Sequence, residues 1–159
     1  VLTPIRSSWN YIHEKLGVSN EENFQKYLNR EISYEEFMRR DIALWRNINL
    51  KTLNDILSEI PLTPGAVETC TELKNLGLDI WIISSGINIL ADRIAHKIGA
   101  SICLSNKIIE ENGVLKGIPI VDSYKKLTVF IGGTLIDFRF YTMLIKPTDA
   151  FGVCLWILL

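Results

Sequence analysis

The segment that most constrains the fold is a buried hydrophobic run that ends in two hydroxyl residues and a glycine. The run Ile80–Ile83 holds β-branched and aromatic residues without polar alternation, which is typical of a parallel strand covered on both faces. Ser84, Ser85 and Gly86 follow it, and an amphipathic helical pattern comes next. This order of strand, loop and helix predicts the repeating unit of an open α/β sheet.

The Ser-Ser-Gly loop has two interpretations. In open α/β sheets, ligands bind beyond the carboxyl ends of the strands, where hydroxyl groups and the N–H groups of a helix N-terminus face an anion such as phosphate. The same loop is also ordinary capping chemistry, in which a serine accepts a hydrogen bond from a backbone N–H of the following helix. The loop by itself leaves both interpretations open.

The chain before this unit predicts helices only. Between Ser7 and Ile60 we expect four short amphipathic helices, which together have about the size of a cap or lid. Trp9 and Trp45 are predicted to belong to the core of this bundle and not to contact substrate, because aromatic side chains dominate small cores. Ser19 with Glu22, and Ser33 with Glu36, are predicted capping boxes, while the first and fourth helices are expected to start at Ser7 and after Asn49.

After Pro61 the pattern changes to alternating helices and strands. The predicted elements are a helix capped by Thr63 and ended by Gly77, the strand described above, a helix over Asn88–Ile98, a strand over Ser101–Leu104, a hairpin over Lys107–Gly117 and a buried strand over Leu127–Ile131. Crossover connections force parallel pairing, so the predicted fold class is α/β, a Rossmann-like parallel sheet with an inserted helical cap and a β-hairpin. We expect residues 1–5 and 62–159 to form the core, and residues 6–61 the cap.

The composition of the chain limits which binding partners and which cellular compartment are expected. The 17 Lys and Arg against 18 Asp and Glu give a net charge of −1, which argues against a nucleic-acid partner. No apolar run reaches membrane-spanning length, and no signal peptide is visible. Cys70, Cys103 and Cys154 have no C-x-x-C spacing, which favours free thiols in a reducing, cytoplasmic compartment. His13 and His96 lack neighbours at metal-ligand spacing and are predicted to be surface helix residues.

Several of these features occur together in one order: the helical insertion, Thr63–Glu68, Glu72–Gly77, the strand into Ser84, and the hairpin. This combination, over about Val1–Asp137, resembles the haloacid dehalogenase (HAD) superfamily of phosphohydrolases, in particular its phosphoserine-phosphatase-like branch. Family members carry an Asp-x-Asp-Gly motif, and the first three residues here resemble the segment directly after its glycine. The resemblance implies that the nucleophilic aspartate and the aspartate that acts as general acid and base lie upstream of residue 1.

The resemblance also implies roles for residues of this chain. Ser84 matches the second motif, whose hydroxyl group hydrogen-bonds a phosphate oxygen, while Ser85 and Gly86 would offer backbone N–H groups. The third motif is a lysine that neutralises negative charge, and Lys126 is favoured over Lys125. Both lysines have the alternative interpretation of solvated loop charges, because the family normally places a helix between this lysine and the next motif.

The fourth motif normally carries two aspartates, of which the first helps to hold Mg²⁺. Here Gly133 occupies the position of that aspartate, and Asp137 alone matches the second. The resemblance implies a Mg²⁺ cofactor, yet no metal ligand can be assigned within this chain. Loss of one oxygen ligand is expected to weaken a Mg²⁺ site substantially.

Arg40 is the candidate for recognition of the leaving group, because in the phosphoserine-specific branch a cap arginine binds the substrate carboxylate. A bidentate guanidinium group suits a carboxylate. The alternative is that Arg39 and Arg40 are exposed helix charges that pair with Glu35 or Glu36.

The sequence supports two hypotheses for function. The first is a Mg²⁺-dependent phosphatase that hydrolyses a small phosphomonoester such as phosphoserine through an aspartyl-phosphate intermediate. The second is a non-catalytic HAD-like domain that binds a phosphorylated ligand or a protein. An aspartate at position 133 would favour the enzyme, and a glycine favours the binding domain. We expect a small phosphorylated metabolite as partner, neither nucleic acid nor membrane, and leave a homodimer open.

Overall fold

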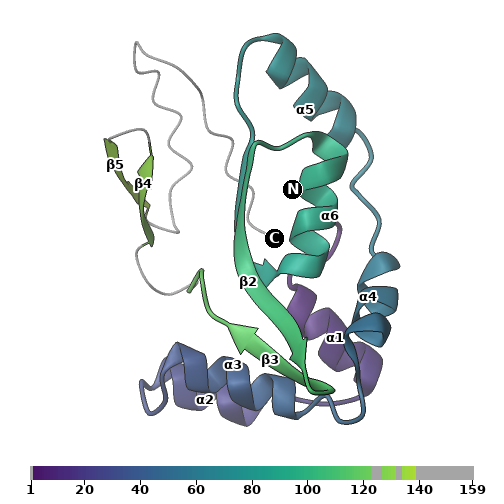
Figure 1. The fold of residues 1–159 in the computed structure, drawn as a ribbon, viewed down its shortest axis with the longest axis vertical. Coiled ribbons are helices and arrows are strands. Elements are labelled where there is room, and N and C mark those ends of the chain that lie inside the picture. Colours follow the sequence, from purple (N-terminus) through teal and green to yellow (C-terminus); the bar gives the residue numbers. More distant parts are fainter. Residues whose placement is uncertain (1, 123–126, 132–133, 139–159) are drawn as a thin grey trace.

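The structure is a computed structural model, which describes residues 2–122 and the strands at 127–131 and 134–138 (Figure 1). The elements, in chain order, are α1 (Ser8–Leu16), α2 (Glu21–Leu28), α3 (Tyr34–Ala43), α4 (Leu50–Ser58), α5 (Ala66–Asn75), β1 (Trp81–Ile87), α6 (Asn88–Ile98), β2 (Ile102–Glu111), β3 (Val114–Ile118), β4 (Leu127–Ile131) and β5 (Thr134–Phe138). Among these described helices, none has the length and apolar character needed to cross a membrane.

The central sheet has the strand order β1-β2-β3. Strand β1 pairs with β2 in parallel, with Ile83 opposite Leu104, and α6 makes the crossover and packs on both strands. Ile82 and Ile83, whose side chains point to opposite faces, are both buried, as expected for a strand covered on both faces. The predicted α/β class with a parallel sheet is therefore confirmed, and α6 has the predicted bounds.

Strand β2 is longer than the sequence pattern predicts. The predicted short strand and the first arm of the predicted hairpin form one continuous strand, which pairs with β3 in antiparallel fashion. The polar residues Ser105 and Asn106 interrupt the apolar pattern, but both are buried inside the strand. The predicted tight turn is confirmed, since Asn112 and Gly113 have φ values of 54° and 77°.

The segment Leu127–Ile131 is a strand, as predicted, but its pairing differs from the prediction. It pairs with β5 in antiparallel fashion, in a two-stranded sheet separate from β1-β2-β3. Only two residues connect Ile131 to Thr134, and a connection of that length joins antiparallel strands, because a parallel crossover needs a dozen residues or more. The expectation that this strand extends the parallel sheet is wrong.

The predicted cap Ser33 is confirmed, since it accepts a hydrogen bond from the backbone N–H three residues ahead. Ser7 and Asn49, which mark the predicted starts of α1 and α4, cap these helices in the same way. Ser19 accepts a hydrogen bond of 3.3 Å from the N–H of Glu21, the first residue of α2, although it stands one position before the N-cap residue. Helix α2 begins after Asn20, whose side-chain amide instead donates to Asp41 over 2.7 Å. The cap predicted at Thr63 is wrong. Helix α5 begins after Gly65, which has a φ of 81°, so that Thr63 and Pro64 belong to a preceding turn.

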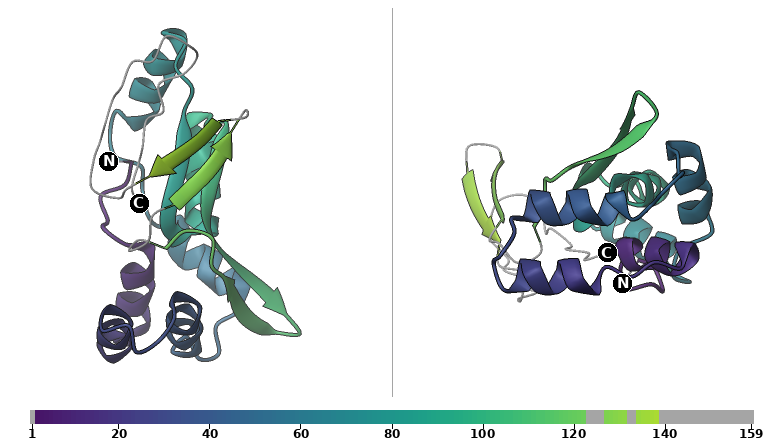
Figure 2. Two further views of the ribbon diagram at one scale, coloured as in Figure 1. Left: turned by 90° about the vertical axis from the view of Figure 1, so that its left-hand side faces the viewer. Right: turned by 90° about the horizontal axis from the view of Figure 1, so that it is seen from below.

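Helices α1, α2 and α3 lie at the end of the molecule from which the β2-β3 hairpin projects (Figure 2). Helix α2 packs on α3, α3 packs on β3, and α4 packs on both α1 and α6. Arg93 of α6 reinforces the last of these contacts, because its guanidinium group donates to the carbonyl oxygens of Leu57, Ser58 and Ile60 at the end of α4. Whether residues 6–61 form a separate domain stays a prediction.

Candidate active site

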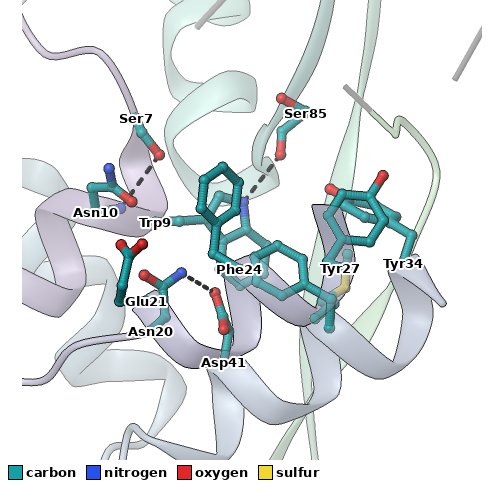
Figure 3. Close-up of a pocket in the computed structure, with 12 residues that line it drawn as sticks. Ser7, Trp9, Asn10, Asn20, Glu21, Phe24, Tyr27, Tyr34, Asp41 and Ser85 are labelled. Carbon is teal, nitrogen blue, oxygen red and sulfur yellow. Dashed lines mark hydrogen bonds between the residues drawn. The ribbon is translucent and has the colours of Figure 1, made fainter. Parts of the chain in front are cut away.

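A pocket of about 280 Å³ lies between α1, α2, α3 and the carboxyl end of β1 (Figure 3). Five aromatic side chains contribute to its wall: Trp9, Phe24, Tyr27, Tyr34 and Phe37. Ser85 is the contribution of β1, so the pocket adjoins the loop for which the sequence predicts a phosphate site. A pocket with aromatic walls and a few polar groups is the usual form of a small-molecule site.

Ser84 lies inside β1 and is fully buried, because the predicted loop Ser84–Gly86 is an irregular stretch within this strand and not a connection after it. Its Oγ accepts a hydrogen bond of 2.9 Å from the N–H of Gly86, within a stretch where the pairing of β1 with β2 changes register between Ile83 and Ile87. Helix α6 begins only after Ile87, and this N-cap residue makes no side-chain cap hydrogen bond. The interpretation of Ser84 as a cap of this helix is therefore wrong.

The carbonyl oxygen of Ser85 connects the loop to the helical part of the chain. It accepts hydrogen bonds from Trp9 Nε1 over 3.0 Å and from Asn106 Nδ2 over 2.8 Å. The N–H of Ile87 donates to the Oγ of Ser8 over 3.0 Å. The first turn of α1 is thus bonded directly to the loop at two points.

The two predicted core tryptophans pack together, with ring centroids 5.3 Å apart. Trp45 is buried, which confirms the prediction for that residue. Trp9 is half-buried and also lines the pocket, so its role is wider than core packing.

Asn106 is a buried polar residue that sequence reasoning missed. Its Nδ2 donates to the hydroxyl oxygen of Tyr34 and to the carbonyl oxygens of Ser85 and Val121, over 2.7 to 3.0 Å. Its Oδ1 accepts from the N–H groups of Ile120 and Val121. The only signal in the sequence is an asparagine within a strand-like segment, where a polar residue is costly unless it is satisfied.

Asp41 is a second buried polar residue at the pocket. Its carboxylate accepts hydrogen bonds from Asn20 Nδ2 over 2.7 Å and from Asn23 Nδ2 over 3.4 Å. Burial raises the pKa of Asp41 to about 6, and the two amide donors oppose this rise only in part. Sequence reasoning did not identify Asp41, because charged residues are common in helices and its spacing gave no further signal.

His13 lies 3.9 Å from Asp41, between its Nε2 and the Oδ2 of the acid. The prediction of a surface position is wrong, since the side chain is buried against Trp45 with ring centroids 5.8 Å apart. Its spacing of four residues from Trp9 places it on the inner face of α1. Burial lowers the pKa of His13 to about 4, so the ring is neutral at pH 7. His96 is exposed, as predicted.

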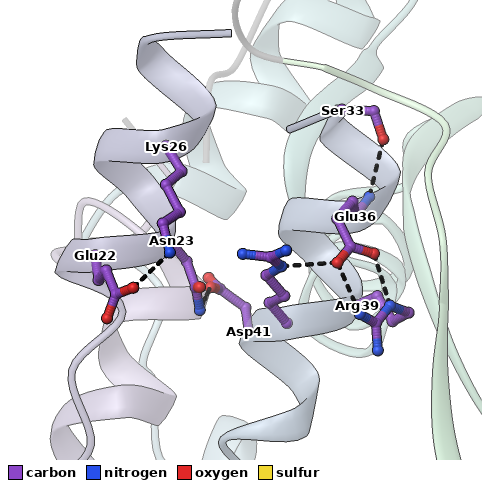
Figure 4. A network of polar contacts seen from close by, with 8 residues as sticks. Glu22, Asn23, Lys26, Ser33, Glu36, Arg39 and Asp41 are labelled. Atoms are coloured by element: carbon purple, nitrogen blue, oxygen red, sulfur yellow. Dashed lines mark hydrogen bonds and ion pairs between the residues drawn. The ribbon is translucent and has the colours of Figure 1, made fainter. Parts of the chain in front are cut away.

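Arg39 and Arg40 both pair with Glu36, which confirms the helix-pairing interpretation for these contacts (Figure 4). Arg39 binds Glu36 through two nitrogens and Arg40 through Nε, each over 2.7 Å. The hydrogen bonds from Arg39 and then Arg40 lower the pKa of Glu36 to about 2. Arg40 is not among the residues that line the pocket. Its assignment to the substrate stays a prediction.

The remaining predicted site residues lie in the last part of the chain. Lys125, Lys126 and Gly133 are outside the described residues. Asp137 lies in β5, where its backbone pairs with Thr128. Nothing in the structure tests the roles predicted for these positions.

A Mg²⁺ site does not emerge from the described residues. That part of the chain contains no group of three or more His, Cys, Asp or Glu side chains that could hold a metal ion. Cys70 and Cys103 are free thiols, buried and half-buried respectively, and Cys154 is outside the described residues. Burial raises the pKa of Cys103 to about 12, which makes it a poor candidate for a thiolate ligand.

Comparison with known proteins gives consistent matches. The family model of haloacid dehalogenase-like hydrolases matches residues 3–127. A phosphoserine phosphatase of Methanocaldococcus jannaschii is 29% identical over 87 residues, which cover 55% of this chain and 41% of that protein. A phosphoserine phosphatase of Albidiferax ferrireducens is 34% identical over 85 residues, which cover 53% of this chain and 36% of that protein. The chain thus spans less than half the length of these two curated relatives.

The fold is also similar to that of a solved protein. A crystal structure of phosphoserine phosphatase in apo form superimposes with a TM-score of 0.59 and 26% identity, over 75% of this chain and 57% of that one. The match therefore covers only part of that larger protein.

Proposed function

This chain belongs to the haloacid dehalogenase-like hydrolase family. On that premise we propose that the parent protein, which is the whole protein that contains this chain, is a Mg²⁺-dependent phosphatase. It hydrolyses a small phosphomonoester of the phosphoserine type through an aspartyl-phosphate intermediate. The relatives named phosphoserine phosphatase support this choice of substrate type. The nucleophilic aspartate and the aspartate that acts as general acid and base are expected before residue 1.

The observation that carries the proposal is the loop Ser84–Gly86 beside the amino end of α6. This helix has 11 residues, and its N-cap residue Ile87 makes no side-chain cap hydrogen bond, so the N–H groups of its first turn can face an anion. The loop is fixed by the hydrogen bonds of Trp9, Asn106 and Ser8. A preorganised set of donors is what stabilises charge on a transferring phosphoryl group.

In this proposal each part of the chain has a chemical task. The Ser84 hydroxyl group donates to a phosphate oxygen, whereas the N–H of Gly86, predicted as a second phosphate donor, donates to Ser84 Oγ in this structure. Lys126 adds positive charge, and the aromatic pocket receives the leaving alcohol and excludes water from it. Mg²⁺, when bound, would neutralise phosphate charge. The described residues do not hold a group of acids that fits this ion by itself.

The competing hypothesis is a non-catalytic domain that binds a phosphorylated ligand or a protein. Gly133 favours it, because the family aspartate at this position helps to hold the metal ion. Both hypotheses use the same anion-binding loop, so they differ in turnover and not in phosphate binding.

Substitution of Ser84 tests the proposal. In the parent protein with Mg²⁺, Ser84→Ala is expected to lower kcat by about one to two orders of magnitude, because a donor to the transition state is lost. Ser84→Thr keeps the hydroxyl group and should retain most of the activity. The matched control is Ser58→Ala, which removes an exposed hydroxyl group on α4. Unchanged turnover in a folded Ser84→Ala protein would exclude this role.

A further inference from the structure

The charged side chains in the described lining of the pocket are all acidic. Its described lining includes the carboxylates of Asp41 and Glu21 but no lysine, arginine or histidine. Glu21 is exposed and accepts a hydrogen bond from Gln25, whereas Asp41 is only 1% exposed. The pocket therefore offers negative charge to a ligand, in its wall and beside its opening.

Asp41 is buried without a cationic partner among the described residues. Its hydrogen bonds come from the uncharged amides of Asn20 and Asn23, and His13 at 3.9 Å is neutral at pH 7. No hydrogen-bond partner of either ring nitrogen of His13 is found in the described part of the chain. A buried charge is costly unless it is paired, so a ligand that brings a positive charge would stabilise this site.

The aromatic walls favour the same kind of ligand. Tyr27 and Phe37 stack with centroids 5.1 Å apart, and Tyr34 packs at an angle against Tyr27 at 5.5 Å. The face of an aromatic ring attracts an ammonium group and gives nothing to a carboxylate. The arginines of α3 pair with Glu36 and do not line the pocket. A carboxylate in the leaving group would thus meet Asp41 without a compensating cation.

We propose that this pocket selects phosphomonoesters whose alcohol carries an ammonium group and no carboxylate, with Asp41 as the specificity-determining residue. The inference rests on the proposed phosphatase function, and it replaces phosphoserine as the substrate by amino-alcohol phosphates, which lack the carboxylate. Phosphate occupies the Ser84 loop, and the ammonium end of the alcohol lies in the pocket that Ser85 and Asp41 both line.

Three phosphomonoesters of similar size test the proposal: O-phosphoethanolamine, n-propyl phosphate and phosphoglycolate. They end in an ammonium, a methyl and a carboxylate group. In the parent protein with Mg²⁺, kcat/KM for O-phosphoethanolamine is expected to exceed that for n-propyl phosphate by about tenfold or more, with phosphoglycolate lowest. O-phosphoserine, which carries both charged groups, should also be a poorer substrate than O-phosphoethanolamine.

Asp41→Asn should reduce the ratio between O-phosphoethanolamine and n-propyl phosphate by about tenfold, since the amide keeps the size but not the charge. The matched control is Asp55→Asn on the exposed face of α4, where Asp55 pairs with Lys51, and it should leave the ratio unchanged. A ratio that Asp41→Asn does not change, or a preference for phosphoglycolate or O-phosphoserine, would overturn the proposal.

Failure of the phosphatase hypothesis gives a different result. If none of the phosphates is hydrolysed, calorimetric dissociation constants for the same ligands decide the question of selectivity. Tightest binding of O-phosphoethanolamine, weakened in Asp41→Asn, supports the ammonium preference without catalysis. Equal binding of the ammonium and carboxylate ligands overturns it.

Discussion

Asp41 and His13 form a buried acid–base pair in which both groups are shifted toward their neutral forms. Burial raises the pKa of Asp41 to about 6 and lowers that of His13 to about 4. Between pH 4 and pH 6 the folded protein therefore holds a proton on Asp41. The unfolded chain holds it on His13 instead, because the ordinary pKa values are 3.8 for the acid and 6.5 for the histidine.

These shifts have opposite effects on stability as pH changes. The raised pKa of Asp41 stabilises the folded state as pH falls from 6 to 4, because the folded state then binds the extra proton. The lowered pKa of His13 destabilises the folded state over pH 6.5 to 4, because there the unfolded state binds the extra proton. In the wild-type protein the two contributions largely cancel.

The substitution Asp41→Asn should reveal how His13 contributes to the pH dependence of the unfolding free energy. Relative to the wild type, the variant is expected to lose about 3 kcal/mol of unfolding free energy between pH 6 and pH 4. Urea denaturation at a series of pH values measures this difference, and His13→Gln should shift the balance in the opposite direction. Parallel stability profiles for wild type and Asp41→Asn would contradict the assignment.

A separate prediction concerns the contribution of Asn106 to the stability of the fold. Asn106→Ala should destabilise the fold by about 3 kcal/mol, because the N–H groups of Ile120 and Val121 and the hydroxyl group of Tyr34 lose their common partner. Asn54→Ala, at an exposed position of α4, is the control in urea denaturation. A loss as small as that of the control would show that these groups find other partners.

Features of single residues that depend on their neighbours in the sequence could be predicted, whereas features that depend on distant residues could not. The cap Ser33 and the helix starts at Ser7 and after Asn49 depend on the nearest residues, so the sequence pattern identifies them. The buried state of Asp41 and Asn106 depends on partners 14 to 72 positions away. No local pattern carries that information.

The helices and strands also divide into those that local patterns predict and those that depend on distant contacts. The helix at Asn88–Ile98 was predicted with its bounds, because an apolar stripe and a terminal glycine both mark it. The continuous strand β2 was predicted in two pieces, because its buried polar residues imitate a loop. The pairing of β4 with β5 was missed, although the two-residue connection at 132–133 already favours a hairpin.

The contact between the hairpin and α3 depends on Gly117. A Cβ atom at this position would lie 2.7 Å from Ile42 Cδ1 and 2.8 Å from Met38 Cγ, and both side chains are buried. Gly117→Ala should therefore destabilise the fold by about 2 kcal/mol and disturb the pocket, which Met38 lines.

Thermal or urea denaturation measures the effect of Gly117→Ala. The comparison is Gly113→Ala in the hairpin turn, where a Cβ meets no atom within 4 Å and only the positive φ is unfavourable. If Gly117→Ala changes neither stability nor ligand binding, hairpin and helix are not as closely packed as described.

At the scale of the whole molecule, the helices of residues 8–58 and the α/β unit are bonded to each other around the pocket. Trp9 and Ser8 connect α1 to the loop after Ile83, and Asn106 connects α3, β1 and the end of the hairpin. The resemblance to the HAD superfamily predicts this arrangement in outline. The acidic and aromatic lining of the pocket emerges only when the three helices are packed together.

The most direct test of the phosphatase assignment is phosphate release by the parent protein from a generic phosphomonoester, p-nitrophenyl phosphate, with Mg²⁺ and after its removal by a chelator. We predict steady turnover that stops on chelation and returns when Mg²⁺ is added back. Absence of phosphate release by a folded parent protein that still binds phosphate would contradict the assignment and favour a non-catalytic binding domain.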